Sequence, residues 1–503
     1  MNKPNIKINL NGGITSPTSL LSILEVAKNS GIETVSFGAR QQLLMYVQQR
    51  EASFFLKKMQ EIEIAYESDS ETFPNILSSY ATADIFALNT ESWLSEGIYL
   101  DILNQFDYKP KLKINICDSG QSHAPFFTGH LNFISSDVSN FWFLYVRFPK
   151  TNRIERFPSL VYSQNIADLA HKMEAAILNQ NTFSYHFLEE MSGQTEGIIF
   201  RQIENELTIP RFVMPYIEGF NVDRTGRMWL GIYRRDEQFS IDFLTELCQL
   251  CEQTRIGNIS ITAWKSLVIK GIDSKNRFLF EKLLGKHGIN VRHGHIELNW
   301  QTEDDSPRGF ELKHYLVKQF DAIDVRTFGV VFAIKTRHKS EVFGSVIIRR
   351  HGYFKFGKFD FWGFFGVYDI FYAEDFNPHT RKRKTHQLGV PKWRLAGELL
   401  KLTRKYFDEL TGEKRGLKIN HIALLKSKTI AVNTAEIYRC RDCWTEYNPQ
   451  FGAEESGIAK GVAFEDLPES FTCPTCDAEK INFTLAIEKS SQTFTSDKFA
   501  LAH

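Results

Sequence analysis

The sequence predicts an α+β protein in which one unit occurs twice and is followed by a small metal-binding domain at the C-terminus. Three observations predict this architecture. Short strand-like and helix-like stretches alternate through the first 430 residues. The same order of elements returns about 224 residues later, which indicates an internal duplication. Four of the seven cysteines lie after residue 439, in two closely spaced pairs.

Composition and charge exclude several classes of protein. A chain of 503 residues predicts about three domains, and its 43% hydrophobic and 24% charged residues match globular proteins rather than disordered ones. The 60 basic and 60 acidic residues cancel, so we expect no global electrostatic binding of nucleic acid. The first ten residues lack an apolar signal, and no apolar run is long enough to span a membrane. We therefore expect a cytoplasmic protein that binds neither nucleic acid nor membranes.

The duplicated unit is a strand, a helix and a second strand that ends in a polar turn. In the first copy we expect a strand at 5–10, a helix that begins at Ser16-Pro17 and a strand at 34–37. In the second copy we expect a strand at 227–233, a helix at 243–254 and a strand at 258–261. One constant offset places residues 34–43 on 258–267. The matched order predicts two halves related by a pseudo-twofold axis.

Each copy precedes a second kind of segment with buried strands and a closing helix. The closing helices are expected near 166–178 and 393–410. We therefore predict a first half at 1–200, a second half at 201–430, a metal-binding domain at 436–489 and a flexible tail at 490–503.

The C-terminal cysteines predict a four-thiolate metal site. Cys440 and Cys443 form one C-x-x-C motif, Cys473 and Cys476 form a second one, and 29 residues separate the two motifs. A C-x-x-C turn directs both thiolates toward one ion, and two such turns complete a tetrahedral site that suits iron or zinc.

The segment from Tyr438 to Phe483 resembles the rubredoxin family. The matching features are Tyr438, Tyr447-Asn448-Pro449, Gly457-Ile458 with Gly461, Phe464-Glu465-Asp466-Leu467-Pro468, Phe471 where the family usually has Trp, the Cys-Pro-x-Cys motif, Lys480 and Phe483. The resemblance implies one mononuclear iron, Fe(Cys)4, that passes single electrons. Two positions depart from the family, because Trp444 and Asp477 replace the Gly that follows each C-x-x-C motif.

The first 430 residues resemble the ferredoxin-like half-domains of sulfite and nitrite reductases. The resemblance rests on Gly12–Pro17, on Ala39-Arg40-Gln41 and on Ile261–Ile269. Lys111–Phe133 also resembles the degenerate, cysteine-free core segment of the family's first half. It implies that Arg40, Lys265 and Lys270 face a cleft for an anion or a vestigial sirohaem, with Arg40 and Lys265 on opposite sides.

That family holds a [4Fe–4S] cluster and a sirohaem through two pairs of cysteines in its second half. Residues 252–439 of this chain contain no cysteine. Because a soft iron–sulfur cluster needs thiolate ligands, we expect neither cofactor and no catalysis by the family's mechanism. Aromatic residues of 354–371 are expected to fill part of the volume that sirohaem occupies in the family.

The other candidate ligands have structural explanations. Cys248 and Cys251 lie three residues apart on an amphipathic helix and Cys117 lies in an apolar strand, so all three are expected in the core. The remaining candidates are His123, His130, His293 and His295, and none of them has the spacing of a metal motif.

These observations favour an electron-transfer protein that carries one iron on a catalytically degenerate reductase-like body and serves nitrite or sulfite assimilation. Residues 436–489 contain eleven acidic against five basic residues, so we expect complementary charge to dock this domain on the protein's own body or on a redox partner protein, either a reductase or an electron donor. Two alternatives remain open: an active sirohaem reductase with unusual ligation, and a non-redox scaffold with structural zinc.

Overall fold

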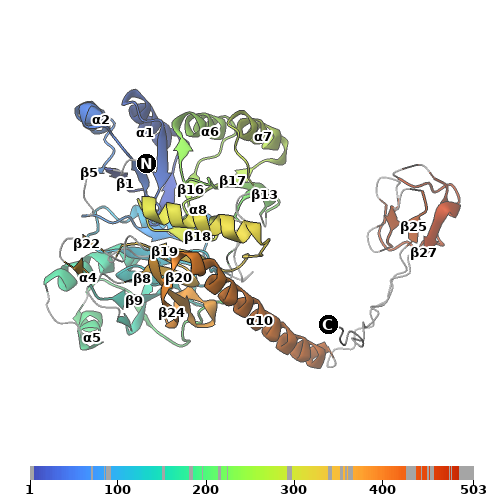
Figure 1. The fold of residues 1–503 in the computed structure, drawn as a ribbon. Coiled ribbons are helices and arrows are strands. Elements are labelled where there is room, and N and C mark those ends of the chain that lie inside the picture. The colour runs from blue at the N-terminus through green and yellow to red at the C-terminus, as the bar shows by residue number, and fades with distance from the viewer. Residues whose placement is uncertain are drawn as a thin grey trace, which may run out of the picture. The chain divides into compact units, whose positions relative to one another are not determined.

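The computed structural model describes two compact units, Met1–Leu410 and Thr411–His503 (Figure 1). We call the first unit the body. The described residues are 5–68, 72–83, 85, 92–149, 153–179, 185–194, 196–212, 214, 217–223, 225–291, 297–337, 342–351, 355–356, 359–360, 366–425, 438–442, 445–449, 452–453, 458–474, 476 and 478–485. The expected tail at 490–503 lies outside them. The boundary at Leu410 falls inside α10 (Lys392–Leu425), before the expected end of the second half at 430.

The predicted duplication is present, and its offset holds to the residue. Helix α1 (Pro17–Asn29) and helix α6 (Ile241–Gln253) coincide at both ends under the offset of 224. Each helix begins with a serine cap. Ser16 accepts the N–H of Ser19 at 3.0 Å, and Ser240 accepts the N–H of Phe243 at 3.1 Å. The two halves therefore begin their helices with the same local chemistry.

The halves exchange strands. Strand β15 (Phe239–Ser240) of the second copy pairs with β3 (Thr34–Phe37) of the first, and β2 (Ile14–Thr15) of the first pairs with β16 (Ile259–Ile261) of the second. Phe239 lies opposite Val35, and Thr15 lies opposite Ile259, which is the same pairing under the offset. This reciprocal pairing is the signature of a pseudo-twofold arrangement within one chain.

The exchanged strands complete two antiparallel sheets of five strands each. The first sheet has the order β15-β3-β4-β1-β5, with β4 at Leu43–Met45, β1 at Ile6–Ile8 and β5 at Glu67–Ser68. The second sheet has the order β13-β14-β17-β16-β2, with β13 at Gly219–Val222, β14 at Met228–Ile232 and β17 at Leu267–Ile272. Helices α1, α2 (Gln49–Glu61), α6 and α7 (Arg277–Lys286) lie at the same end of the body in Figure 1. Their apolar faces share one core, which confirms that Cys248 and Cys251 are core residues. Burial raises the pKa of the Cys248 thiol to about 12, so it stays protonated.

The second kind of segment is also duplicated. The first copy orders its strands β6 (Leu77–Ser78), β7 (Ile114–Cys117), β8 (Leu131–Ser135), β9 (Phe141–Arg147), β11 (Ser159–Tyr162) and β12 (Phe200–Gln202), with β10 (Ile154–Arg156) beside β9. The second copy orders β18 (Trp300–Thr302), β19 (Phe332–Lys335), β20 (Val346–Arg350), β23 (Val367–Ala373) and β24 (Arg383–Pro391). In each sheet the first three strands are parallel and the following pairs are antiparallel. Helices α4 (Ile166–Asn179) and α10 follow, near the expected positions.

The remaining elements of the body are shorter or cover these sheets. They are α3 (Glu96–Asn104), α5 (Tyr185–Gln194), α8 (Pro307–Ala322) and the hairpin of β21 (Lys355–Phe356) and β22 (Phe359–Asp360). Cys117 is fully buried in β7, as predicted. Of the aromatic residues expected to fill a vacated cofactor volume, Phe356 and Phe359 pair in the β21–β22 hairpin, and Phe371 on β23 pairs with Ile347. The others lie outside the described residues.

The C-terminal unit contains a small antiparallel sheet. Strand β25 (Tyr438–Cys440) lies between β26 (Glu446–Tyr447) and β27 (Phe483–Leu485).

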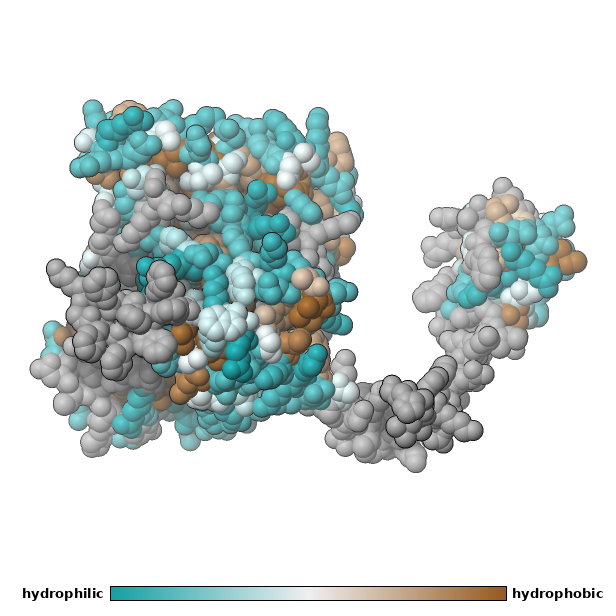
Figure 2. Space-filling model, viewed as in Figure 1, coloured by the Kyte–Doolittle hydropathy of each residue, from teal (hydrophilic) through white to brown (hydrophobic). Residues whose placement is uncertain are grey.

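On the face shown in Figure 2, hydrophilic residues predominate and hydrophobic areas are small. Among the described residues, the helices lack the length and apolar character needed to cross a bilayer.

A buried histidine in the body predicts acid sensitivity. The His379 ring contacts Phe126 at 4.3 Å between centroids, and its Nε2 faces the carbonyl oxygen of Ser122 at 3.1 Å. Burial lowers the pKa of His379 to about 4, whereas unfolding restores about 6.5. Between these values the unfolded chain binds the proton, so stability is complete above pH 6.5 and falls as the pH decreases toward 4.

We expect the protonation of this single group to lower the free energy of unfolding of the body by about 2 kcal/mol between pH 7 and pH 5. Urea unfolding of wild type and His379→Gln at both pH values measures the difference, with His171→Gln as the control at an exposed position of α4. The pH-dependent loss should shrink in His379→Gln alone. An unchanged loss in that variant would show that His379 titrates normally in the folded body.

Candidate functional site

Two backbone turns present the cysteines of the C-terminal unit. Cys440 ends β25, and its N–H donates to the carbonyl of Thr445 at 2.8 Å. The N–H of Cys473 donates to the carbonyl of Ala478 at the same distance. Cys440 and Cys473 are buried, whereas Cys476 is exposed. The two turns therefore leave one of the three described thiols at the surface.

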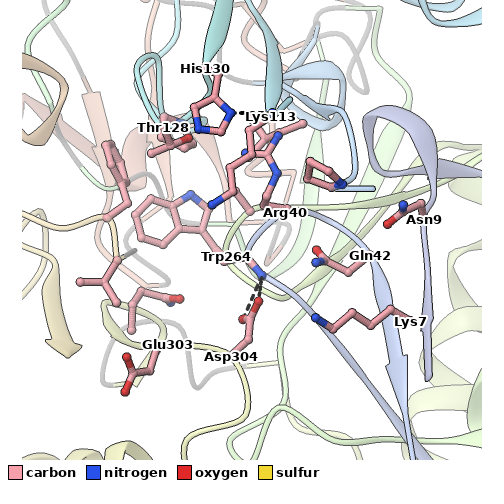
Figure 3. A pocket seen from close by; sticks show the side chains of 18 of the residues that line it. Lys7, Asn9, Arg40, Gln42, Lys113, Thr128, His130, Trp264, Glu303 and Asp304 are labelled. Atoms are coloured by element: carbon pink, nitrogen blue, oxygen red, sulfur yellow. Dashed lines mark hydrogen bonds between the residues drawn. The ribbon is translucent and has the colours of Figure 1, made fainter. Parts of the chain in front are cut away.

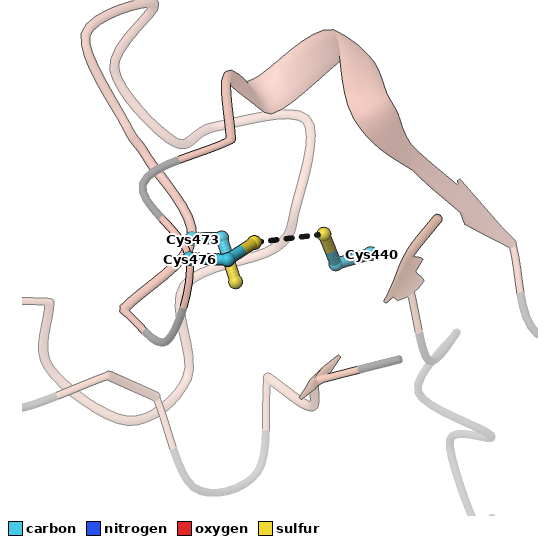
Figure 4. A group of neighbouring side chains, drawn as sticks. All are labelled: Cys440, Cys473 and Cys476. Carbon is cyan, nitrogen blue, oxygen red and sulfur yellow. Dashed lines mark hydrogen bonds between the residues drawn. The ribbon is translucent and has the colours of Figure 1, made fainter. Parts of the chain in front are cut away.

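The three described thiols converge on one point (Figure 4). The Sγ atoms of Cys440, Cys473 and Cys476 all lie within 4.8 Å of one another, and those of Cys440 and Cys476 are 3.7 Å apart. Thiolates bound tetrahedrally at about 2.3 Å from an iron or zinc ion lie roughly 3.8 Å from one another. The site therefore fits one such ion. Cys443 lies outside the described residues, as do Trp444 and Asp477.

A small aromatic core holds the two turns together. The rings of Tyr438 and Phe464 stack at 4.1 Å, and Phe471 contacts Phe483 at 5.7 Å. The ammonium group of Lys480 donates to the carbonyl of Leu467 at 2.7 Å. This bond connects the segment before β27 to the loop that precedes Cys473. With so few apolar residues, a unit of this size depends on its metal for stability.

The body contains a separate cavity of about 470 Å³ between its two halves (Figure 3). Its lining residues come from both copies of the duplicated unit and from both large sheets. Those used below are Arg40, Gln42, Lys111, Lys113, His130, Trp264, Thr302, Glu303, Asp304 and Phe343.

Arg40 lines this cavity, as expected for a residue that faces an anion, but it also anchors the surrounding backbone. Its guanidinium donates to the carbonyl of Asn75 from Nε at 3.0 Å and to the carbonyl of Ile114 at 2.9 Å. A third bond reaches the side-chain oxygen of Asn115 at 3.2 Å. Much of the donor capacity of Arg40 is therefore spent within the protein.

Lys265 does not line the cavity. Its ammonium group is buried and bonds Glu237 at 2.8 Å, with Asp304 at 3.3 Å. The duplication explains the difference, because the offset of 224 places Lys265 on Gln41 and Trp264 on Arg40. Lys265 and Gln41 both have positive φ, 57° and 64°, and both are buried, while Trp264 and Arg40 both line the cavity. The counterpart of Arg40 at the cavity is therefore Trp264, one position before Lys265, and the expected placement of Lys265 across the cleft from Arg40 is wrong.

Lys270 also lies away from the lining residues. Its ammonium group forms an ion pair with Glu96, donates to the carbonyl of Tyr80 at 3.0 Å, and lies 4.2 Å from the centre of the Tyr80 ring. These contacts join β17 to the first half of the body. The structure therefore places Lys265 in ion pairs within the second half and Lys270 in an ion pair that joins the two halves.

The histidines noted in the sequence have other roles where the structure describes them. His123 is buried against the ring of Trp264, and burial lowers its pKa to about 3. His130 lines the cavity, and its Nδ1 accepts the N–H of Lys113 at 3.1 Å. His293 and His295 lie outside the described residues. Within the described part of the chain, the three cysteines form the group of His, Cys, Asp or Glu side chains close enough to share a metal ion.

Sequence comparison decides the nature of the C-terminal unit. Residues 437–483 match the rubredoxin family. The chain is 38% identical to rubredoxin 4 of Rhodococcus sp. (strain Q15) over 52 residues, which are 10% of this chain and 87% of that protein. It is 45% identical to rubredoxin-2 of Chlorobaculum tepidum over 49 residues, again 10% of this chain and 94% of that protein. The chain belongs to the rubredoxin family through this domain.

The match confirms the resemblance predicted from the sequence, and together with the convergence of the three cysteines it supports a Cys-ligated iron site and an electron-transfer role. Tyr447, Phe464, Phe471 and Phe483 belong to its core, and partly buried Tyr438 packs against them. Phe471, where the family usually has Trp, occupies a core position 4% exposed.

The body has a known fold. Over 78% of this chain and 79% of the other, the structure resembles that of the Mycobacterium tuberculosis NirA protein, with a TM-score of 0.57 and 12% sequence identity. This likeness confirms the expected sulfite and nitrite reductase-like fold of the body beside the rubredoxin domain.

Sequence reasoning missed most of the cavity lining. Trp264 was noted for its motif but not as a lining residue, although it occupies the position of Arg40 under the same offset. Lys113 belongs to the segment Lys111–Phe133 but has no predicted role, and Glu303 and Asp304 belong to no motif. Only the meeting of distant segments in the fold identifies them.

Proposed function

We propose that this protein is an electron carrier in which the rubredoxin domain holds one iron and the reductase-like body is a scaffold without catalytic activity. The observation that supports the iron site most directly is the convergence of Cys440, Cys473 and Cys476 at the spacing of thiolates around a single ion. The domain's similarity to rubredoxins favours iron over zinc.

The four ligands would be Cys440, Cys443, Cys473 and Cys476. Bound iron supplies reversible one-electron chemistry. The protein's own contribution is the environment of the thiolates. Buried Cys440 and Cys473 exclude water from one side of the site, and exposed Cys476 leaves a thiolate at the surface, where a redox partner protein can approach.

The hydrogen bonds and ion pairs of the body's basic residues support the proposal that the body has no catalytic activity. Arg40 donates to main-chain carbonyls, Lys265 is neutralised by Glu237 and Asp304, and Lys270 pairs with Glu96. The 188 residues without cysteine remove the thiolates that an iron–sulfur cluster needs. The residues present therefore do not fit a sirohaem coupled to a [4Fe–4S] cluster.

The likeness of the body to the NirA protein supports a place in nitrite or sulfite assimilation. In this role the scaffold brings the rubredoxin domain to a redox partner protein, either a reductase or its electron donor, in the cytoplasm. The acidic composition of residues 436–489 favours a partner with a basic docking surface.

A reductive titration of the purified protein tests the iron assignment. We expect one iron per chain, with less than a tenth of that amount of zinc, and a visible absorption that one electron equivalent bleaches reversibly. A colourless protein with one zinc per chain would instead make the domain a structural module and would remove the proposed role.

A further inference from the structure

The body cavity has chemically different sides. In Figure 3, His130, Lys113 and Arg40 lie on one side of the Trp264 indole, and Glu303 and Asp304 lie on the other. Its volume of about 470 Å³ falls within the range of roughly 300–1,000 Å³ found for sites that bind small organic molecules. Glu303 pairs with Arg337 and Asp304 pairs with Lys265, so their charges are already compensated. A ligand that suits this lining carries negative charge at the end near Lys113 and Arg40.

Trp264 provides a fixed flat wall between these sides. Its indole N–H donates to the carbonyl of His123 at 2.8 Å, and the residue is 2% exposed. The ring of Phe343, another lining residue, lies 5.8 Å from it. Only a small part of the buried indole reaches the cavity, and that part is a rigid apolar boundary. A planar ring can pack against it without ordering a flexible side chain.

Two buried polar atoms at the cavity have no hydrogen-bond partner among the described residues. They are Oγ1 of Thr302, a residue 3% exposed, and Oε1 of Gln42. Buried polar atoms are nearly always hydrogen-bonded, so atoms of this kind at a cavity indicate a ligand or water that supplies the missing bonds. The amide oxygen of Gln42 can only accept, and the ligand must therefore offer an N–H or O–H group there.

We propose that this cavity binds a planar heteroaromatic phosphate, a ligand of the mononucleotide class. The phosphate lies toward Lys111 and Lys113, the ring lies against Trp264, and ring N–H groups bond Thr302 and Gln42. Lys111 is exposed and Lys113 is half-buried, so a phosphate there keeps partial contact with water. A mononucleotide has its charge at one end only.

Calorimetric titration of the full-length iron-loaded protein tests this proposal with two matched pairs of probes. The pairs are flavin mononucleotide with riboflavin and adenosine monophosphate with adenosine, and within each pair only the phosphate differs. We expect at least one phosphate probe to bind with a Kd below 1 mM, and its partner to bind at least tenfold more weakly, which corresponds to about 1.4 kcal/mol.

Two variants test the assigned contacts. Lys113→Gln is expected to weaken the phosphate probe about tenfold and to leave the partner without phosphate unchanged. Thr302→Val removes the unpartnered hydroxyl at nearly constant volume and should weaken both members of the pair several-fold. Lys275→Gln, at an exposed ion pair with Asp273, is the control and should change neither.

Binding of neither phosphate probe at 1 mM, equal binding within both pairs, or an affinity unaffected by both cavity variants would overturn the proposal. Iron content and visible spectrum, measured on the same samples, report on the rubredoxin domain separately. The ligand site can therefore fail while the electron-carrier role stands, and the reverse also holds.

Discussion

The Cys473→Ala variant is expected to lose its iron and to unfold the rubredoxin domain while the body stays folded. The Cys473 side chain is fully buried beside Cys440, and its thiol belongs to the group of three that converge on one point. A domain with so small a core obtains much of its stability from the metal, so losing one ligand removes both. Iron quantification, visible absorption and the NMR dispersion of the domain's amide signals measure the effect.

Cys117→Ala provides the matched control, because Cys117 is equally buried but lies in β7 of the body. This control should keep full iron and its spectrum and lose only some stability of the body. A Cys473→Ala protein that retained one iron with an unchanged spectrum would refute the assignment of the site.

The Glu237→Gln variant is expected to destabilise the body by about 3–5 kcal/mol, because it removes the carboxylate that buried Lys313 contacts and leaves buried Lys265 with Asp304 alone. Glu237 contacts Lys265 at 2.8 Å and Lys313 at 3.3 Å, and all three side chains are almost completely buried. Burial by itself would raise the pKa of Glu237, but the two lysines hold it below its ordinary value. Urea unfolding at pH 7, monitored by the body's tryptophans, measures the change.

Asp242→Asn is the control, since Asp242 pairs with Lys28 at 2.7 Å on the surface and its loss should change stability far less. The comparison also tests the role given to Lys265. If Glu237→Gln unfolded with the free energy of wild type, the ion pair would not be structural, and Lys265 would again be a candidate for binding an anion.

The sequence predicted the duplicated elements well because local signals mark them. Serine caps, helical spacing of leucines and a common offset place α1 and α6 to the residue. The four cysteines were predictable for the same reason, since the C-x-x-C spacing expresses the metal geometry locally.

The cavity was harder to predict because it forms where distant segments meet. Whether Arg40 or Gln41 faces it depends on a turn in which Gln41 has a φ of 64°, and no residue pattern in the sequence marks that conformation. The neutralisation of Lys265 depends on Glu237 and Asp304, which precede and follow it by 28 and 39 residues. Exchange of β2 and β15 between the halves likewise has no local signal, because strand pairing partners are chosen by the whole sheet.

The central claim is that electrons reside on the rubredoxin iron and that the body performs no reduction itself. Turnover of nitrite and of sulfite with a reduced viologen donor, measured on protein whose iron and sirohaem contents are known, tests this claim most directly. We predict one iron per chain, no sirohaem and no consumption of either anion above the rate without protein. Stoichiometric sirohaem, or turnover of either anion that depends on the protein, would contradict the account and identify the body as an active reductase.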